Sequence, residues 1–253
     1  MPGVERARIV VNNPASLKNI RIVLCAPRHP GNIGAAARAL KTMGLTQLYL
    51  VEPQRFPDPE AEWRASRATD VLAGAKVCAS LDEALAGVAF SVACSARSRE
   101  VAVPAVTARE AAAQVVDIAR TQPVALVFGN ETYGLTTAEV NKCRLIAAIP
   151  ANPRYSSLNV AAAVQVFAYE LRVAASDSTP QGRPRAMASH DEVEGFYAQL
   201  EATMVETGFL NPEHPKKLMP RLRRLFARAQ LEKEEVNILR GILKALRSPK
   251  KRS

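Results

Sequence analysis

The first two thirds of the chain alternates short apolar runs with alanine-rich helical patterns. Apolar runs of this kind are typical of strands that are buried on both faces. Helical spacing covers residues 33–43, 107–120 and 157–173, and Gly44 suits the end of the first of these helices. Strands that alternate with helices predict an α/β fold, a parallel sheet flanked by helices. The strands are expected at residues 20–25, 47–51, 76–79, 89–94, 124–128 and 145–149.

The last third of the chain has a different pattern. Residues 174–189 are rich in Pro, Gly and Ser and have no periodicity, which predicts a linker. Helical spacing follows at 191–206 and 220–246, and no strand pattern remains. We therefore expect a domain at 1–173, a linker at 174–189 and a small helical C-terminal extension at 190–253.

The chain has 253 residues and a formal net charge of +10 at pH 7. A basic protein often binds polyanions, and nucleic acid is the first candidate. A basic protein without such a partner is the alternative. No apolar run approaches the ~18 residues of a membrane span, and the N-terminus lacks a signal-peptide pattern. We expect a cytoplasmic protein with no membrane partner.

Several kinds of chemistry are disfavoured by the residues available. The four cysteines are not at metal-ligand spacing and the three histidines are scattered, so we expect no metal. The glycines at residues 31 and 34 lack the third glycine of a dinucleotide fingerprint. No phosphate-binding Gly-Lys-Thr loop and no Ser-His-Asp set stands out.

The segment 29–38 (HPGNIGAAAR) is unusual for plain scaffolding. A Pro-Gly turn leads into a helix whose first turn has no bulky side chain, so its N–H groups could approach an anion. Arg38 then projects from a surface otherwise made of alanine. Arg38 either serves a ligand or pairs with an acid across the helix, and its spacing favours neither.

Two further loops follow predicted strands. In 127–135 (VFGNETYGL), Gly129 and Gly134 bracket Glu131, and ligands of open α/β sheets bind at the carboxyl ends of strands. In 149–159 (IPANPRYSSLN), Ser156 or Ser157 can cap the next helix. An ordinary turn and an ordinary cap are the alternatives. All three loops together could form one ligand pocket.

The same three segments resemble the three motifs of the SpoU (TrmH-like) branch of the SPOUT methyltransferases. Asn32 followed by Arg38 matches the first motif, 126–135 the second and 149–172 the third. Three motifs in order are highly specific, and the resemblance spans about residues 20–172. Within that branch, motifs one and three and the helical extension are most similar to the bacterial enzymes that methylate cytidine or uridine 32 of tRNA.

This resemblance implies a trefoil-knotted sheet, a homodimer and S-adenosylmethionine as cofactor. It implies 2′-O-methylation of the ribose at position 32 (C and/or U) of the tRNA anticodon loop. Arg38, Asn32 and Ser157 would be the catalytic residues. Position 94 is a cysteine where a small residue such as threonine is expected, so its contact would be through the backbone. The implied cofactor-binding residues are Cys94, Ser95, Ala96, Gly129, Glu131, Gly134, Ile149, Ser156, Ser157, Leu158 and Asn159.

The extension carries a basic segment with no acidic residue between His214 and Leu231. Arg221, Arg224 and Arg228 would share one helical face toward phosphates, and Leu222, Leu225 and Phe226 would pack on the other side. A solvated basic face without a partner is the alternative. The predicted RNA-binding residues are Lys216, Lys217, Arg221, Arg223, Arg224 and Arg228.

Two other functions remain open at this point. A SpoU-type enzyme that acts on ribosomal RNA would share all three motifs, although the extension weighs against it. A non-catalytic RNA-binding protein on the same scaffold would not need an intact Arg38 or an intact third motif.

Overall fold

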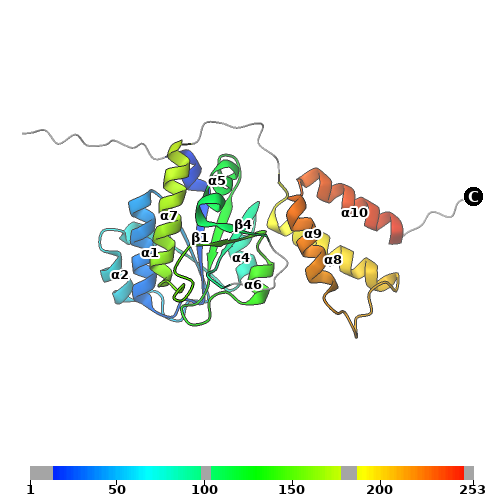
Figure 1. The fold of residues 1–253 in the computed structure, drawn as a ribbon, viewed down its shortest axis with the longest axis horizontal. Coiled ribbons are helices and arrows are strands. Elements are labelled where there is room, and N and C mark those ends of the chain that lie inside the picture. The colour runs from blue at the N-terminus through cyan, green and yellow to red at the C-terminus, as the bar shows by residue number, and fades with distance from the viewer. Residues whose placement is uncertain (1–13, 98–103, 178–186, 248–253) are drawn as a thin grey trace, which may run out of the picture.

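The alternating patterns fold into one parallel sheet with helices on both faces (Figure 1). The computed structural model describes residues 14–97, 104–177 and 187–247. The strand order is β3-β2-β1-β6-β4-β7-β5, and every pairing is parallel. The strands are β1 (Ile20–Cys25), β2 (Gln47–Val51), β3 (Lys76–Cys78), β4 (Phe90–Cys94), β5 (Ala105–Thr107), β6 (Val124–Phe128) and β7 (Leu145–Ala148).

Side chains of each central strand alternate between two hydrophobic cores. Ile22 and Leu24 of β1 enter the core under the larger helices, and Val23 and Cys25 enter the core on the opposite face. On the first face lie α1 (Pro30–Met43), α2 (Pro59–Ala65), α3 (Thr69–Ala73), α5 (Ala108–Ala119), α7 (Val160–Asp177) and the 3-10 helix η1 (Ala15–Asn19). On the second lie the short helices α4 (Leu81–Leu85) and α6 (Thr137–Asn141).

Helix α1 ends at Met43 with Gly44 as its cap, as predicted, but it begins at Pro30, three residues before the predicted start. Pro30 suits the first turn, where its missing N–H costs nothing, and Gly44 has the left-handed φ of 83° that favours glycine. Gly34 lets α2 pack directly on the backbone of α1. A Cβ atom at this position would lie 2.0 Å from the carbonyl oxygen of Ala61.

The extension consists of α8 (His190–Glu206), α9 (Leu218–Ala229) and α10 (Lys233–Arg247), with a small core of its own. It lies beside the face that α4 and α6 cover (Figure 1). Polar contacts join it to the α/β part. Arg144 Nη2 donates to the carbonyl of Ala188 at 2.7 Å, and His190 Nε2 lies 3.2 Å from an oxygen of Asp82.

The structure corrects the single helical segment expected at 220–246. The chain breaks into α9 and α10 because Gln230 has a left-handed φ of 50° and Leu231 turns into the core of the extension. Strand β5 was not predicted, since it has only three residues, at the edge of the sheet. Helix α7 continues to Asp177, inside the predicted linker.

Two predictions fall partly outside the described residues. The linker residues 178–186 lie outside them, so the domain boundaries stay a prediction. The knot also stays a prediction, since residues 98–103, which join β4 to β5, are not described. In the described ranges, no helix is both long and apolar enough to cross a membrane.

We expect Gly34→Ala to destabilise the fold, because its methyl group meets backbone rather than a flexible side chain. The loss should be about 2 kcal/mol, the usual range for overpacking. The free energy of unfolding in urea measures it. Gly241→Ala in α10 is the matched control, since nothing lies within 4 Å of a Cβ there. That change should stabilise the helix slightly. Equal effects of the two substitutions would contradict the proposed packing of α1 on α2.

Candidate active site

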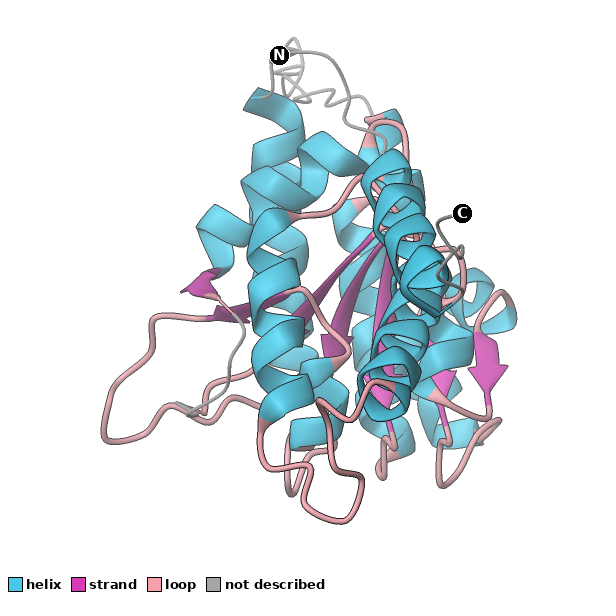
Figure 2. Ribbon diagram, turned by 90° about the vertical axis from the view of Figure 1, so that its right-hand side faces the viewer, coloured by secondary structure: helices cyan, strands magenta, loops and turns pink. Residues whose placement is uncertain are grey.

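A cavity of about 590 Å3 lies at the carboxyl ends of β4, β6 and β7. The strand arrows in Figure 2 point mainly toward the lower edge of the molecule, where the long loops gather. The three loops singled out in the sequence all reach this cavity. Of the predicted site residues, Asn32, Cys94, Ser95, Ala96, Gly129, Glu131, Gly134, Ile149, Ser156, Ser157, Leu158 and Asn159 line it.

Glu131 joins the second loop to the start of α1. Its carboxylate accepts hydrogen bonds from the backbone N–H of Arg28 at 2.9 Å and of His29 at 3.2 Å, and from Asn32 Nδ2 at 3.0 Å. Both N–H groups precede α1 and are occupied by the protein's own carboxylate. The approach of an anion to the N–H groups of the first turn of α1 itself stays a prediction.

Asn32 continues the connection to the third loop. Its Oδ1 accepts a hydrogen bond from Asn159 Nδ2 at 2.9 Å. The Oδ1 of Asn159 in turn accepts from the N–H of Ala161 at 2.9 Å, so Asn159 caps α7. The expected cap, Ser156 or Ser157, is therefore wrong. Those serines are left to line the cavity.

Burial raises the pKa of Glu131, but the hydrogen bonds from Asn32, Arg28 and His29 outweigh it and hold the pKa below its usual value. Glu131 is therefore a carboxylate at neutral pH. Burial raises the pKa of the Cys94 thiol well above its usual value. Cys94 is a neutral thiol there and is unsuited to be a nucleophile or a metal ligand.

The loop after β6 is a tight turn that only glycine permits at its first position. A Cβ atom at Gly129 would lie 2.1 Å from the backbone of Gly134 and of Leu135. Asn130 holds the turn, since its Nδ2 donates to the carbonyl of Ala26 at 2.8 Å. Gly134, at the end of the turn, has a left-handed φ of 66°. Gly129 thus serves the closure of its own loop.

The cavity also has an apolar floor, which the sequence does not predict. Phe128 and Phe167 meet edge to face with ring centroids 5.5 Å apart, and Leu135 and Ala147 also line the cavity. These residues are part of apolar runs and look like ordinary core, so no sequence signal sets them apart. An apolar floor with a few polar groups is typical of a small-molecule site.

Arg38 does not line this cavity. It lies on α1 nearly two turns beyond Asn32, and its side chain is exposed. In the described part of the chain no acid pairs with it, so the alternative of an ion pair across the helix finds no support. Ser157, also predicted to be catalytic, lies at the cavity.

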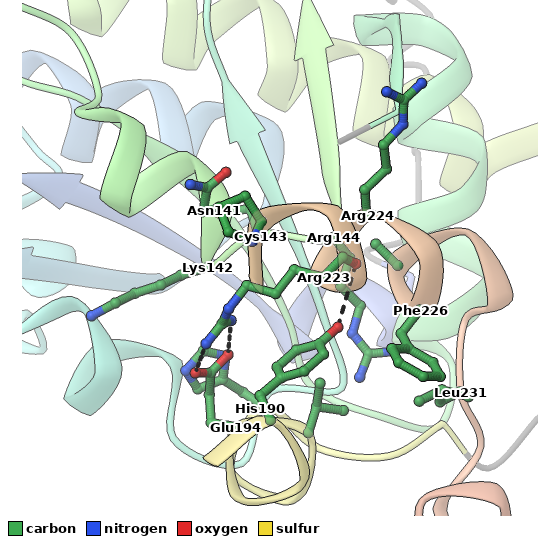
Figure 3. A pocket seen from close by; sticks show the side chains of 14 residues that line it. Asn141, Lys142, Cys143, Arg144, His190, Glu194, Arg223, Arg224, Phe226 and Leu231 are labelled. Atoms are coloured by element: carbon green, nitrogen blue, oxygen red, sulfur yellow. Dashed lines mark hydrogen bonds and ion pairs between the residues drawn. The ribbon is translucent and has the colours of Figure 1, made fainter. Parts of the chain in front are cut away.

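The basic face of the extension is only partly as predicted. Lys216, Lys217, Arg221, Arg224 and Arg228 are exposed. Arg223 differs, since its guanidinium binds both oxygens of Glu194 at 2.6 and 2.7 Å and covers the ring of Tyr197. In Figure 3 the side chain of Arg223 points toward Glu194, and that of Arg224 points away from it.

The packed side of α9 also needs a correction. Phe226 packs edge to face on Phe196 with centroids 4.9 Å apart, and Leu222 is half-buried, as expected. Leu225 is 49% exposed instead of packed. Across the described residues, no group of three His, Cys, Asp or Glu side chains is placed to hold a metal ion.

Comparison with known proteins gives two family matches. The SpoU rRNA methylase family matches residues 19–169, and the C-terminal domain of the tRNA methyltransferase TrmJ matches residues 191–253. The tRNA (cytidine/uridine-2′-O-)-methyltransferase TrmJ of Pectobacterium atrosepticum is 49% identical over 91% of this chain and 97% of its own length. The TrmJ of Klebsiella pneumoniae is 48% identical over 93% of this chain and 99% of its own length.

A solved structure of similar architecture is TrmJ from Z. mobilis. It has a TM-score of 0.79 and 34% sequence identity, over 90% of this chain and 99% of that one. A probable methylase family protein from Haemophilus influenzae has a TM-score of 0.61 and 40% identity, over 91% and 97%.

We expect Glu131→Gln to lower the thermal stability at neutral pH. The amide cannot accept all three hydrogen bonds, and each bond to a charged group contributes about 1.5–3 kcal/mol. Because the pKa of Glu131 is lowered by folding, its stabilisation is present above its ordinary pKa of 4.5 and is lost as the pH falls through the folded value.

The difference in melting temperature between wild type and Glu131→Gln should therefore shrink as the pH is lowered from neutrality. Thermal melting followed by circular dichroism measures it. Glu62→Gln, the same chemical change at an exposed position on α2, is the control and should have little effect. A gap that stays constant down to acid pH would rule out this role of the Glu131 charge.

Proposed function

This chain belongs to the SpoU methylase family, and on that premise we propose that it transfers a methyl group from S-adenosylmethionine to a ribose 2′-hydroxyl of tRNA. The observation that carries the proposal is the convergence of three separate loops on one cavity. The extension supports a tRNA substrate, because it matches the C-terminal domain of tRNA methyltransferase TrmJ. A tRNA substrate would place the enzyme in the cytoplasm.

The cavity suits such a cofactor in size and lining. Small-molecule pockets commonly have volumes of about 300–1,000 Å3, and this one is near 590 Å3. Its apolar floor suits an adenosine, and the small residues Ser95, Ala96 and Gly129 leave backbone groups within reach of polar atoms. When bound, the cofactor supplies the methyl group on a sulfonium.

The residues of this chain must orient and activate the ribose 2′-hydroxyl, which is a poor nucleophile at neutral pH. Arginine has a pKa above ~12 and is therefore a weak base. We assign to Arg38 the polarisation of the hydroxyl, a contact with the adjacent phosphate and the stabilisation of the alkoxide as it forms. Asn32 and Ser157 would hold the loops around the reacting atoms.

The exposed position of Arg38 favours a site shared between two copies. Arg38 lies outside the cavity of its own chain, so a second copy is a direct way to supply it. The neighbouring helices α1 and α7 present a common outer face of mostly small or apolar residues. This face comprises Ala35 and Arg38 on α1 and Ala162, Val166 and Tyr169 on α7.

The nucleotide that is methylated is the finer part of the proposal. We propose cytidine or uridine at position 32 of the anticodon loop, as the sequence resemblance implies. Mass-spectrometric mapping of 2′-O-methyl nucleosides, after incubation with S-adenosylmethionine, tests it on total tRNA and on ribosomal RNA in parallel. Methylation of the ribosomal RNA alone would favour the alternative of a SpoU-type enzyme that acts on ribosomal RNA. If calorimetry detects no binding of S-adenosylmethionine, the alternative of a non-catalytic RNA-binding protein is favoured.

Arg38→Ala should abolish methylation and leave S-adenosylmethionine binding nearly unchanged. Arg38→Lys should also fail, because a point charge does not reproduce the planar guanidinium. Methylation rates and calorimetric titration measure the two properties separately. More than about a tenth of wild-type activity in Arg38→Ala, a loss below ~1.4 kcal/mol, would contradict the catalytic role.

The protein should be a homodimer through the outer face of α1 and α7. Light scattering at micromolar concentration should give twice the mass of one chain, and Ala162→Asp should give a monomer because it buries an unpaired charge. Ala202→Asp is the matched control on the exposed surface of α8 and should stay dimeric. If the wild-type protein has the mass of a monomer, a site shared between two copies is ruled out.

The extension should hold tRNA through the exposed side of α9. Arg221→Glu and Arg224→Glu should each weaken binding across all tRNAs and reduce the salt dependence by roughly one unit of slope per lost phosphate contact. Lys244→Glu makes the same charge change on α10 and is the control. If all three variants weaken tRNA binding equally, net charge alone explains the effect and α9 is not a specific tRNA-binding surface.

A further inference from the structure

Two tight turns at the mouth of the cavity each expose a tyrosine ring. Tyr155 is 80% exposed, and it also lines the cavity. Tyr133 is 67% exposed and lies in the turn between Asn130 and Gly134. A single exposed aromatic ring is common on protein surfaces, but two rings beside one cavity are a feature to explain.

Both turns hold their tyrosine in a fixed place. The N–H of Tyr155 donates to the carbonyl of Asn152 at 2.9 Å, and the side chain of Asn152 accepts from the N–H of Arg154 at 2.9 Å. In the other turn, the N–H of Gly134 donates to the carbonyl of Asn130 at 2.8 Å. The backbone that carries each ring is therefore already ordered, and a tyrosine side chain has only two χ angles left to fix when a flat ligand stacks on it.

The charges at the mouth are positive. Arg97 lines the cavity, Arg154 precedes Tyr155, and both side chains are exposed with no ion-pair or hydrogen-bond partner in the described ranges. Arg28 donates from Nη1 to the hydroxyl of Thr132 at 3.2 Å, which places it beside the turn of Tyr133. Glu131 is the only acid among the cavity-lining residues described, and its carboxylate is occupied by hydrogen bonds.

Exposed aromatic rings among unpaired arginines match the chemistry of unpaired RNA. Proteins bind single-stranded loops by stacking bases on aromatic side chains and by contacts of arginine with phosphates. A ribose can present its 2′-hydroxyl to the cavity only if its base lies at the mouth, where the two tyrosines are.

We propose that Tyr155, together with Tyr133 on the turn after β6, stacks on unpaired bases of the RNA loop whose ribose enters the cavity, while Arg154 and Arg97 contact the flanking phosphates. This inference rests on the proposed function and adds an RNA-binding surface on the α/β part, separate from α9. Its ligand class is single-stranded RNA.

The test measures binding of fluorescein-labelled tRNA by anisotropy, on the full-length protein. Tyr155→Ala should raise the Kd for tRNA about tenfold, and Tyr155→Phe, which keeps the ring, should stay within about twofold of wild type. Both variants should bind S-adenosylmethionine like wild type in calorimetry. A duplex RNA of similar length has no unpaired base and should bind all three proteins equally.

Salt dependence separates stacking from charge. Tyr155→Ala should leave the slope of log Kd against log salt unchanged, and Arg154→Ala should reduce it by about 0.7 units, the value for a single strand. Equal tRNA affinity of Tyr155→Ala and wild type would overturn the proposal. An equal loss in Tyr155→Phe would also overturn it, because the hydroxyl rather than the ring would then matter.

Other outcomes are equally decisive. Weaker S-adenosylmethionine binding by Tyr155→Ala with unchanged tRNA affinity would make Tyr155 part of the cofactor site. A change of mass in light scattering would assign the ring to contacts between copies. If the wild-type protein binds tRNA but does not methylate it, the proposed function is refuted. The comparison of Tyr155→Ala with Tyr155→Phe would still test the stacking proposal.

Discussion

The hydrogen bonds that link Glu131, Asn32 and Asn159 are the constraint on which the site depends. These residues come from the loop after β6, the first turn of α1 and the start of α7. Each link uses a side chain that is satisfied in only one arrangement, so the three loops are positioned together. The rim of the cavity is therefore set by polar contacts, and its floor is set by the hydrophobic core that contains Phe128 and Phe167.

The sequence predicted the centre of the fold well because burial leaves a strong pattern. Strands β1, β2 and β6 have the predicted bounds, since their residues are apolar on both faces. The short helices α4 and α6, at five residues each, were missed because a segment of that length holds barely more than one helical turn. The break between α9 and α10 was missed because it depends on Leu231 reaching the core of the extension, a tertiary contact.

The site was predictable to the extent that its residues are adjacent to strand ends. The loops after β4, β6 and β7 contain the predicted lining residues, since parallel strands place their carboxyl ends at one edge. Sequence spacing could not give the partners within that edge. It assigned a possible cap to serine where Asn159 caps α7, and it grouped Arg223 with the free arginines although Glu194 holds it. The cap is local, since Asn159 lies only two residues before Ala161, whereas the pair of Arg223 and Glu194 joins residues 29 apart in sequence.

The extension and the cavity lie at opposite ends of the same three strands. The residues that dock the extension, Gly87, Gln122 and Arg144, precede β4, β6 and β7, and the cavity loops follow these strands. Strands of four or five residues at about 3.3 Å per residue separate the two edges by roughly 15 Å. On the proposed function, an RNA held by α9 would extend along the molecule before a ribose reached the cavity of the same chain. Affinity from phosphate contacts and selection at the cavity mouth would then be set by different residues, as in the general division between contacts that position a nucleic acid and contacts that specify it.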